Sequence, residues 1–255
     1  MMRLTILTPL IFSALLAQPQ EARQELNLGV SAYKDARYPE AIEHFSNAVK
    51  LDPNFVTAHL YLGTAYMRQY IPGSESPDNQ KMAQLALDAF RRALNLEAQN
   101  EIAISSVASL YYQQKKFSES ADWYKRAIAV NPNNKEAWYT LGVIAWSQFY
   151  PAYAQARAKL GMKPEDPGPL PDRAARQNLT AAYGAIIDEG LRNLEKALSL
   201  DPEYDDAMAY MNLLVRERAD MDETQAEYQN DIKTADEWVQ KALDTKKRKA
   251  EQPRP

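Results

Sequence analysis

The stretch from Glu101 to Asn134 reads EIAISSVASLYYQQKKFSESADWYKRAIAVNPNN. Apolar residues recur along it at spacings of three and four, which predicts helices that each bury one face. The stretch closes on Asn131-Pro132 and two further asparagines. Proline cannot continue the hydrogen-bond ladder of a helix and restricts the residue before it, so a helix is expected to end there. The stretch therefore predicts a helix–turn–helix unit of 34 residues.

The end of this unit recurs along the chain. Alanines occupy equivalent places at Ala48, Ala93, Ala127, Ala197 and Ala242, with spacings of 45, 34, 70 and 45 residues. Four of the five stretches run on into Asp52-Pro53, Glu97-Ala98, Asn131-Pro132 and Asp201-Pro202, with the proline lost in the second. The spacings fit a 34-residue period with insertions, the largest of 36 residues in the fourth repeat. A period of this length is typical of stacked helical hairpins.

Further landmarks recur in register with these alanines. In the stretch quoted above they are Ile104, Val107-Ala108, Tyr111, Phe117, Ser120, Tyr124, Ala127 and Pro132. Small residues stand where two helices must approach closely, and large residues fill the space between them. In this pattern the chain resembles the tetratricopeptide repeat (TPR) family, over about residues 22–250.

The resemblance implies an all-α fold, a right-handed superhelical solenoid of about five helix–turn–helix repeats. Their expected bounds are residues 22–55, 56–100, 101–134, 135–204 and 205–250, with 251–255 as a disordered tail. The extra residues fall between the two helices of a repeat, so elongated hairpins are expected in repeats two, four and five. The insertion in repeat four covers about residues 148–180. Whether it only packs as a small helical head or also grips a partner is left open by the sequence.

The resemblance also implies a concave groove lined by the first helix of each repeat. Carried over by position, the candidate partner-binding residues are Tyr33, Lys34, Thr64, Met67, Arg68, Ser109, Tyr112, Gln113, Tyr139, Val143 and Trp146. This mixture suits a peptide, with Tyr and Trp as anchors. Co-chaperone members of the family clamp a carboxylate with Lys, Asn and Arg. Leu26 and Val30 occupy the first clamp positions here, which argues against that role.

Residues 1–17 resemble a secretory signal peptide. Arg3 supplies a positive charge, residues 4–16 are mostly apolar, and small residues at Ala14 and Ala17 permit cleavage. The apolar stretch is short for a permanent membrane helix. We expect an exported, periplasmic or secreted bacterial protein with no stable membrane span after cleavage.

Composition and motifs argue against several other functions. A net charge of −4 gives no support for nucleic-acid binding, and the absence of cysteine excludes disulfides and thiolate chemistry. The two histidines, His44 and His59, lie at packing or surface positions of the repeat pattern. The sequence contains no HExxH, GxSxG or GxGxxG motif and no glycine-rich loop of the kind that binds phosphate. We therefore expect no enzymatic activity, no cofactor and no metal site.

Two functions remain compatible with the sequence. The first is a scaffold or adaptor that binds peptide segments in the concave groove at the bacterial cell envelope. The alternative is an envelope polysaccharide export or assembly factor whose aromatic residues contact carbohydrate. Partner identity cannot be derived from the repeat pattern, because function resides in the site and not in the fold.

Overall fold

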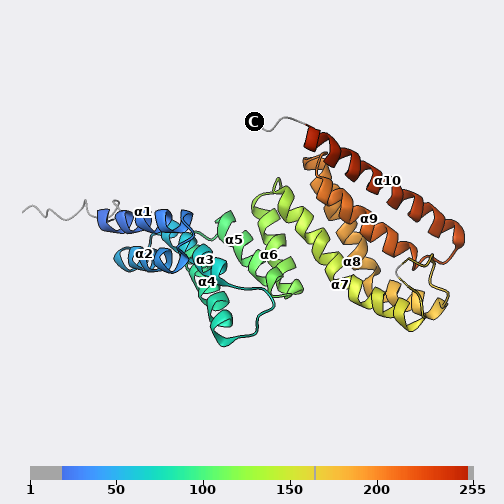
Figure 1. The fold of residues 1–255 in the computed structure, drawn as a ribbon, viewed down its shortest axis with the longest axis horizontal. Coiled ribbons are helices and arrows are strands. Elements are labelled where there is room, and N and C mark those ends of the chain that lie inside the picture. Colours follow the sequence, from blue (N-terminus) through green and yellow to red (C-terminus); the bar gives the residue numbers. More distant parts are fainter. Residues whose placement is uncertain (1–18, 164, 252–255) are drawn as a thin grey trace, which may run out of the picture. The chain divides into compact units, whose positions relative to one another are not determined.

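A computed structural model describes residues 19–163 and 165–251, and these form ten helices and no strand (Figure 1). The helices are α1 (Gln20–Lys34), α2 (Tyr38–Leu51), α3 (Val56–Gln69), α4 (Pro77–Leu96), α5 (Glu101–Gln113), α6 (Phe117–Val130), α7 (Lys135–Lys159), α8 (Arg173–Leu200), α9 (Asp205–Ala219) and α10 (Gln225–Glu251). The predicted all-α fold is confirmed. Residues 1–17, expected to be a signal peptide, and 252–255 of the expected tail lie outside the described residues.

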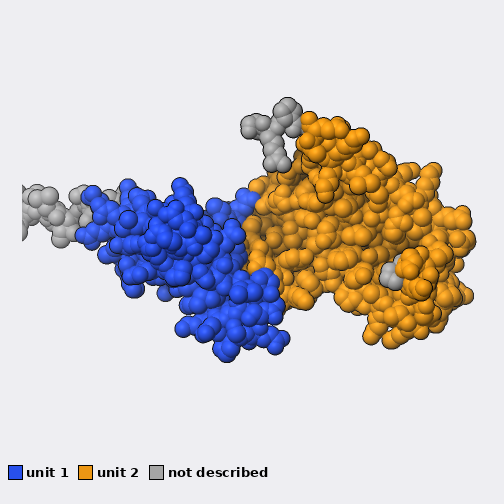
Figure 2. Space-filling view, in the orientation of Figure 1, with its two compact units in different colours: residues 1–103 blue, residues 104–255 orange. Residues whose placement is uncertain are grey.

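The chain divides into two compact units, which Figure 2 colours separately. The N-terminal unit comprises residues 1–103 and the C-terminal unit residues 104–255, so the boundary falls within α5. In the N-terminal unit α1 packs on α2 and α3 on α4. In the C-terminal unit α7 packs on α8 and α9 on α10, and α7 also contacts α6 and α9. Successive helices therefore form hairpins.

Glycines allow the close approach of the two helices in three hairpins. A Cβ atom added to the glycine would lie within 2.4–2.7 Å of a large side chain on the second helix, in the pairs Gly29–Phe45, Gly63–Phe90 and Gly142–Leu194. A residue with a side chain would force those atoms apart. The glycine contacts a large side chain in the same way in each hairpin, although more residues separate the two in each successive pair. The extra residues of the longer hairpins therefore lie beyond this contact, in longer helices and in the loop that joins them.

The acid or asparagine before each proline has a local structural role. Oδ1 of Asp52, Asn131 and Asp201 accepts a hydrogen bond from the backbone N–H two residues later, at 3.0 Å in each case. Asp and Asn side chains favour turns because they form this bond with their own backbone. A side chain of the next helix then closes the turn: His59 Nε2 and Trp138 Nε1 each lie 2.9 Å from the carbonyl oxygen of the preceding proline.

The hairpin of repeat four is the longest, with 25 residues in α7 and 28 in α8. Its connecting loop is held by Arg157, which is 6% exposed and pairs with the buried carboxylate of Asp220 after α9. The same guanidinium donates to the carbonyl oxygens of Lys163 and Asp166, at 2.6 and 2.7 Å. Asp220 in turn accepts a hydrogen bond from the Tyr153 hydroxyl at 3.0 Å. The insertion is thus an integral part of the C-terminal unit.

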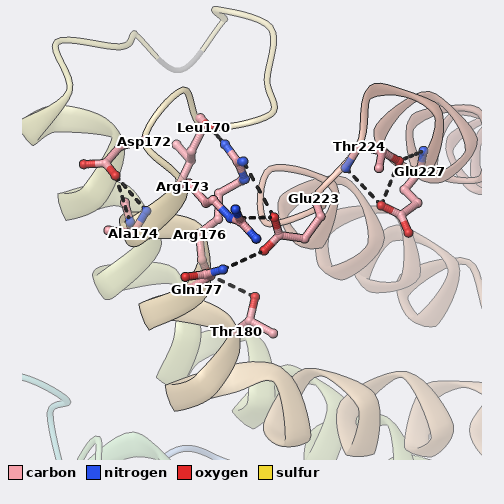
Figure 3. A network of polar contacts seen from close by, with 11 residues as sticks. Leu170, Asp172, Arg173, Ala174, Arg176, Gln177, Thr180, Glu223, Thr224 and Glu227 are labelled. Atoms are coloured by element: carbon pink, nitrogen blue, oxygen red, sulfur yellow. Dashed lines mark hydrogen bonds and ion pairs between the residues drawn. The ribbon is translucent and has the colours of Figure 1, made fainter.

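A second polar network joins the start of α8 to the turn before α10, as Figure 3 shows. Glu223 contacts Arg173 and Arg176 and accepts a hydrogen bond from Gln177 at 3.3 Å. Asp172 caps α8 by accepting hydrogen bonds from the N–H groups of residues 174 and 175. These contacts fix the long hairpin against the next one.

Candidate partner-binding surface

The candidate residues of the N-terminal unit lie on α1 and α3. Arg68 Nε donates a hydrogen bond to the Tyr33 hydroxyl over 2.9 Å, which brings these two residues together. Lys34 is exposed and Met67 is partly exposed. The Thr64 hydroxyl donates to the carbonyl oxygen of Leu60 in its own helix, at 2.8 Å. Tyr33 and Arg68 thus form a small polar pair with an aromatic ring.

The candidate residues of α5 lie next to a buried tyrosine of α6. The Tyr124 hydroxyl forms hydrogen bonds with the side chains of Ser109 and Thr140, and burial raises the pKa of its phenol. Gln113 Nε2 lies 3.4 Å from the Ser109 hydroxyl. Ser109 is therefore positioned by its hydrogen bond with Tyr124 of α6, and Ser109, Tyr112 and Gln113 are all partly exposed.

Four rings on α7 and α9 form a continuous series of contacts that we call the aromatic face: Tyr139, Tyr210, Trp146 and Tyr150. The Trp146 ring stacks on Tyr150 with a centroid distance of 4.8 Å and meets Tyr210 edge-on at 5.7 Å. Tyr210 also meets Tyr139 edge-on at 5.7 Å. Tyr150 is 41% exposed, and the other three rings are partly exposed. The aromatic face thus joins two predicted residues, Tyr139 and Trp146, through a tyrosine of the next repeat.

Val143, which was also predicted to bind a partner, does not belong to the aromatic face. Its side chain is only 4% exposed. The reason is the packing of α7, which contacts α6 and α8 as well as α9. A helix with neighbours on several sides buries more of its positions. Some residues that the repeat pattern assigns to the partner-binding face are therefore buried.

Two carboxylates, Glu136 and Asp206, act on the tyrosines of the aromatic face. Burial is the main cause that raises the pKa of the Tyr139 and Tyr210 phenols, and the nearby charge of Asp206 raises both further. Tyr112 is close enough to add to both shifts. Glu136 also acts on Tyr139 and accepts a hydrogen bond from the hydroxyl of Tyr204. The phenols therefore stay neutral at physiological pH, in a region of negative potential.

One carboxylate lies beneath the aromatic face. Trp146 Nε1 donates a hydrogen bond to Oε1 of Glu217 at 3.1 Å, and Glu217 is 7% exposed. Its second oxygen, Oε2, is buried and has no hydrogen-bond partner among the described residues. Burial raises the pKa of this carboxyl to about 7, and the neighbouring Asp220 charge raises it as well. Glu217 therefore changes its charge near neutral pH.

The sequence reasoning missed Tyr210 and Glu217, both of which lie in α9. Repeat five departs furthest from the family pattern, with Met211-Asn212 in place of Leu-Gly, so positions were not carried over to it. The repeat pattern does contain a signal for Glu217. Glu217 is the thirteenth residue of its repeat, the place that Gln113 occupies in repeat three. The same count extended by one repeat finds it.

Both histidines have local structural partners. His59 holds the turn before α3, and His44 Nδ1 lies 2.8 Å from Oε2 of Glu25. Within residues 19–163 and 165–251, no three His, Asp or Glu side chains are grouped as metal ligands would be. In the same part of the chain, no helix is long and apolar enough to cross a membrane.

Solved structures share this fold over most of the chain. A crystal structure of MamA protein matches with a TM-score of 0.61 and 18% identity, over 92% of this chain and 97% of that one. The structure of YrrB, described as a TPR protein with an unusual peptide-binding site, matches with a TM-score of 0.54 and 17% identity. That match covers 88% of this chain and 86% of YrrB.

A family model described as TPR repeat matches residues 31–69 and 108–148. The chain therefore contains tetratricopeptide repeats in these two stretches. The predicted fold class, an all-α solenoid of such repeats, is thereby confirmed. The aromatic face spans the first helices of repeats four and five, and the second family match ends between Trp146 and Tyr150.

Among curated proteins, the TPR chain is similar to Hsp70-Hsp90 organizing protein 3 of Arabidopsis thaliana. The two are 24% identical over 118 residues, which is 46% of this chain and 19% of that protein. The chain thus spans about a fifth of the length of this relative. The similarity covers repeats and does not extend over the whole of the relative.

Proposed function

We propose that this TPR protein is a non-catalytic scaffold or adaptor that binds peptide segments of partner proteins. The observation that carries the proposal is the aromatic face, where Tyr139, Tyr210, Trp146 and Tyr150 contact one another in series and keep part of their surface exposed. Tyrosine and tryptophan provide large contact area at low conformational cost, and they are enriched among the residues that dominate binding energy.

The rigidity of the surrounding structure supports this role. Trp146 is oriented by Glu217, and α7 and α9 are tied together by the Arg157–Asp220 pair. A preorganised surface loses less entropy on binding than a mobile one, so more of the contact energy appears as affinity. YrrB, which shares the fold, is described as having a peptide-binding site. That description belongs to YrrB and motivates the same test here.

The proposal includes a location at the bacterial cell envelope. It rests on residues 1–17, whose positive charge, apolar stretch and small residues resemble a secretory signal. Cell fractionation with N-terminal sequencing of the recovered protein tests this part by itself. Recovery of the protein from the periplasm or medium without residues 1–17 supports export. Recovery from the cytosol with Met1 retained contradicts it.

Peptide binding is tested with an array of twelve-residue peptides of random sequence, probed with the purified TPR protein. Trp146→Ala and Tyr150→Ala are expected to lose most of the bound signal. Trp123→Ala is the matched control, since Trp123 lies on α6 outside the aromatic face and stacks with Arg126 of its own helix. Equal loss in all three variants, or no bound peptide, contradicts the proposal. Binding to envelope polysaccharide without binding to any peptide would favour the alternative of a polysaccharide export or assembly factor.

A further inference from the structure

The aromatic face combines exposed rings with a buried carboxylate, and this combination favours a particular kind of ligand. The face of an aromatic ring carries negative potential and attracts cations. A carboxylate that accepts a hydrogen bond from an indole N–H adds negative charge at the edge of that ring. Trp146 is such an indole, with Glu217 as its acceptor at 3.1 Å.

The buried oxygen of Glu217 is unusual for a residue with only a packing role. Buried polar atoms in proteins nearly always have a hydrogen-bond partner, and a buried charge without one is costly. Oε2 of Glu217 has none among the described residues, although 93% of the residue's surface is buried. Asp220, the other charged group that acts on Glu217, is negative, and the nearby cation Arg157 is already paired with Asp220. A cation at the ring of Trp146 would offset this negative charge.

The charges carried by α7 and α9 point the same way. Burial is the main cause that raises the pKa of the Tyr139 phenol, and the negative charges of Asp206 and Glu136 raise it further. Two cations on these helices are already paired with other groups: Lys135 with Asp201, and Arg216 with Asp236 on α10. The surface therefore offers aromatic faces and carboxylates, which is complementary to a positively charged side chain.

We propose that the aromatic face recognises a lysine or arginine side chain of the bound peptide, with Trp146 and Tyr150 contacting the cation and Glu217 acting through Trp146. This inference rests on the proposed peptide-binding function and specifies its ligand. Glu217 is too buried to contact the ligand, so it is a positioning residue. The preference is opposite in sign to that of a site built to hold a carboxylate.

The test uses labelled peptides that differ at one central residue: lysine, acetyl-lysine, arginine, citrulline or glutamate. Acetyl-lysine and citrulline each remove the charge of the parent residue, and citrulline also keeps nearly the size of arginine. Fluorescence anisotropy with the purified full chain at pH 8 is expected to show roughly 3- to 30-fold tighter binding of the charged member of each pair, the range that cation–π contacts produce. Glu217→Gln is expected to reduce that ratio without abolishing binding, and Trp146→Leu to bring it close to one.

The outcomes separate the two proposals. Peptides that bind equally well with lysine and acetyl-lysine overturn the cation preference and leave peptide binding intact. A failure of every peptide to bind overturns the proposed function itself. A cation preference that persists unchanged in Trp146→Leu, with circular dichroism showing that the variant is folded, overturns the assignment to the aromatic face. Trp123→Leu, on α6, is expected to keep the full ratio.

Discussion

The carboxyl group of Glu217 makes the stability of the protein depend on pH in a defined direction. Burial raises its pKa from 4.5 to about 7. A group with a raised pKa in the folded state binds its proton more tightly when folded, so folding is favoured while the proton is retained. This contribution is fully present below pH 4.5 and is lost as the pH rises through about 7. At about 1.4 kcal/mol for each pH unit, the loss totals about 3 kcal/mol.

Glu217→Gln removes this dependence while keeping nearly the same shape. The carbonyl oxygen of glutamine can still accept the hydrogen bond from Trp146 Nε1. We expect the variant to gain about 2–3 kcal/mol relative to the wild type between pH 5 and pH 8, because only the wild type must bury a charge at the higher pH. Urea unfolding at both pH values, followed by circular dichroism at 222 nm, measures the difference.

A matched control separates this effect from the general pH dependence of the fold. Glu195→Gln makes the same chemical change at an exposed residue of α8, and its unfolding curves are expected to shift with pH as those of the wild type do. Parallel pH dependence in the wild type and Glu217→Gln would refute the reasoning. So would a variant that is destabilised equally at pH 5 and pH 8.

Two further predictions concern packing and the buried ion pair. Gly142→Ala places a Cβ atom 2.4 Å from Cγ of Leu194, so we expect the free energy of unfolding to fall by about 1–3 kcal/mol, with a lower Tm by calorimetry. Gly184→Ala is the control, because its Cβ atom would meet only Thr180 Cγ2, at 3.6 Å, and we expect the Tm to stay the same or rise slightly. An unchanged Tm in Gly142→Ala would show that the two helices are not closely packed there. Asp220→Ala leaves the buried guanidinium of Arg157 without its carboxylate, and we expect about 3–5 kcal/mol lower stability and faster proteolysis in the loop between α7 and α8. Cleavage at the wild-type rate would argue against that pair as the anchor of the loop.

The hairpins were predictable because their determinants are local. Spacings of three and four mark each helix, and the acid or asparagine before proline marks where the second helix ends. Glycine and alanine landmarks identify the close contacts, and Ala48, Ala93, Ala127 and Ala197 are all fully buried in the structure. Each of these signals acts within one repeat, so a sequence pattern is sufficient to find it.

The polar contacts between repeats were not predictable in the same way. Trp146 and Glu217 are 71 residues apart, and Arg157 and Asp220 are 63 apart. Their meeting depends on how α7 and α9 stack and on the length of the insertion between them. Tyr210 was missed for the same reason, and the burial of Val143 was not predicted because the number of neighbours of α7 is a property of the tertiary structure.

The central claim is that the aromatic face of α7 and α9 is where this TPR protein binds peptide. The most direct measurement is site-specific crosslinking, with a photoreactive phenylalanine analogue placed at Tyr150 and, in a separate sample, at Trp123. The ligand is a lysine-containing peptide that bound the protein in the peptide array. We predict that it crosslinks to position 150 and only weakly to position 123. Crosslinking from position 123 that equals or exceeds that from position 150 would contradict the account.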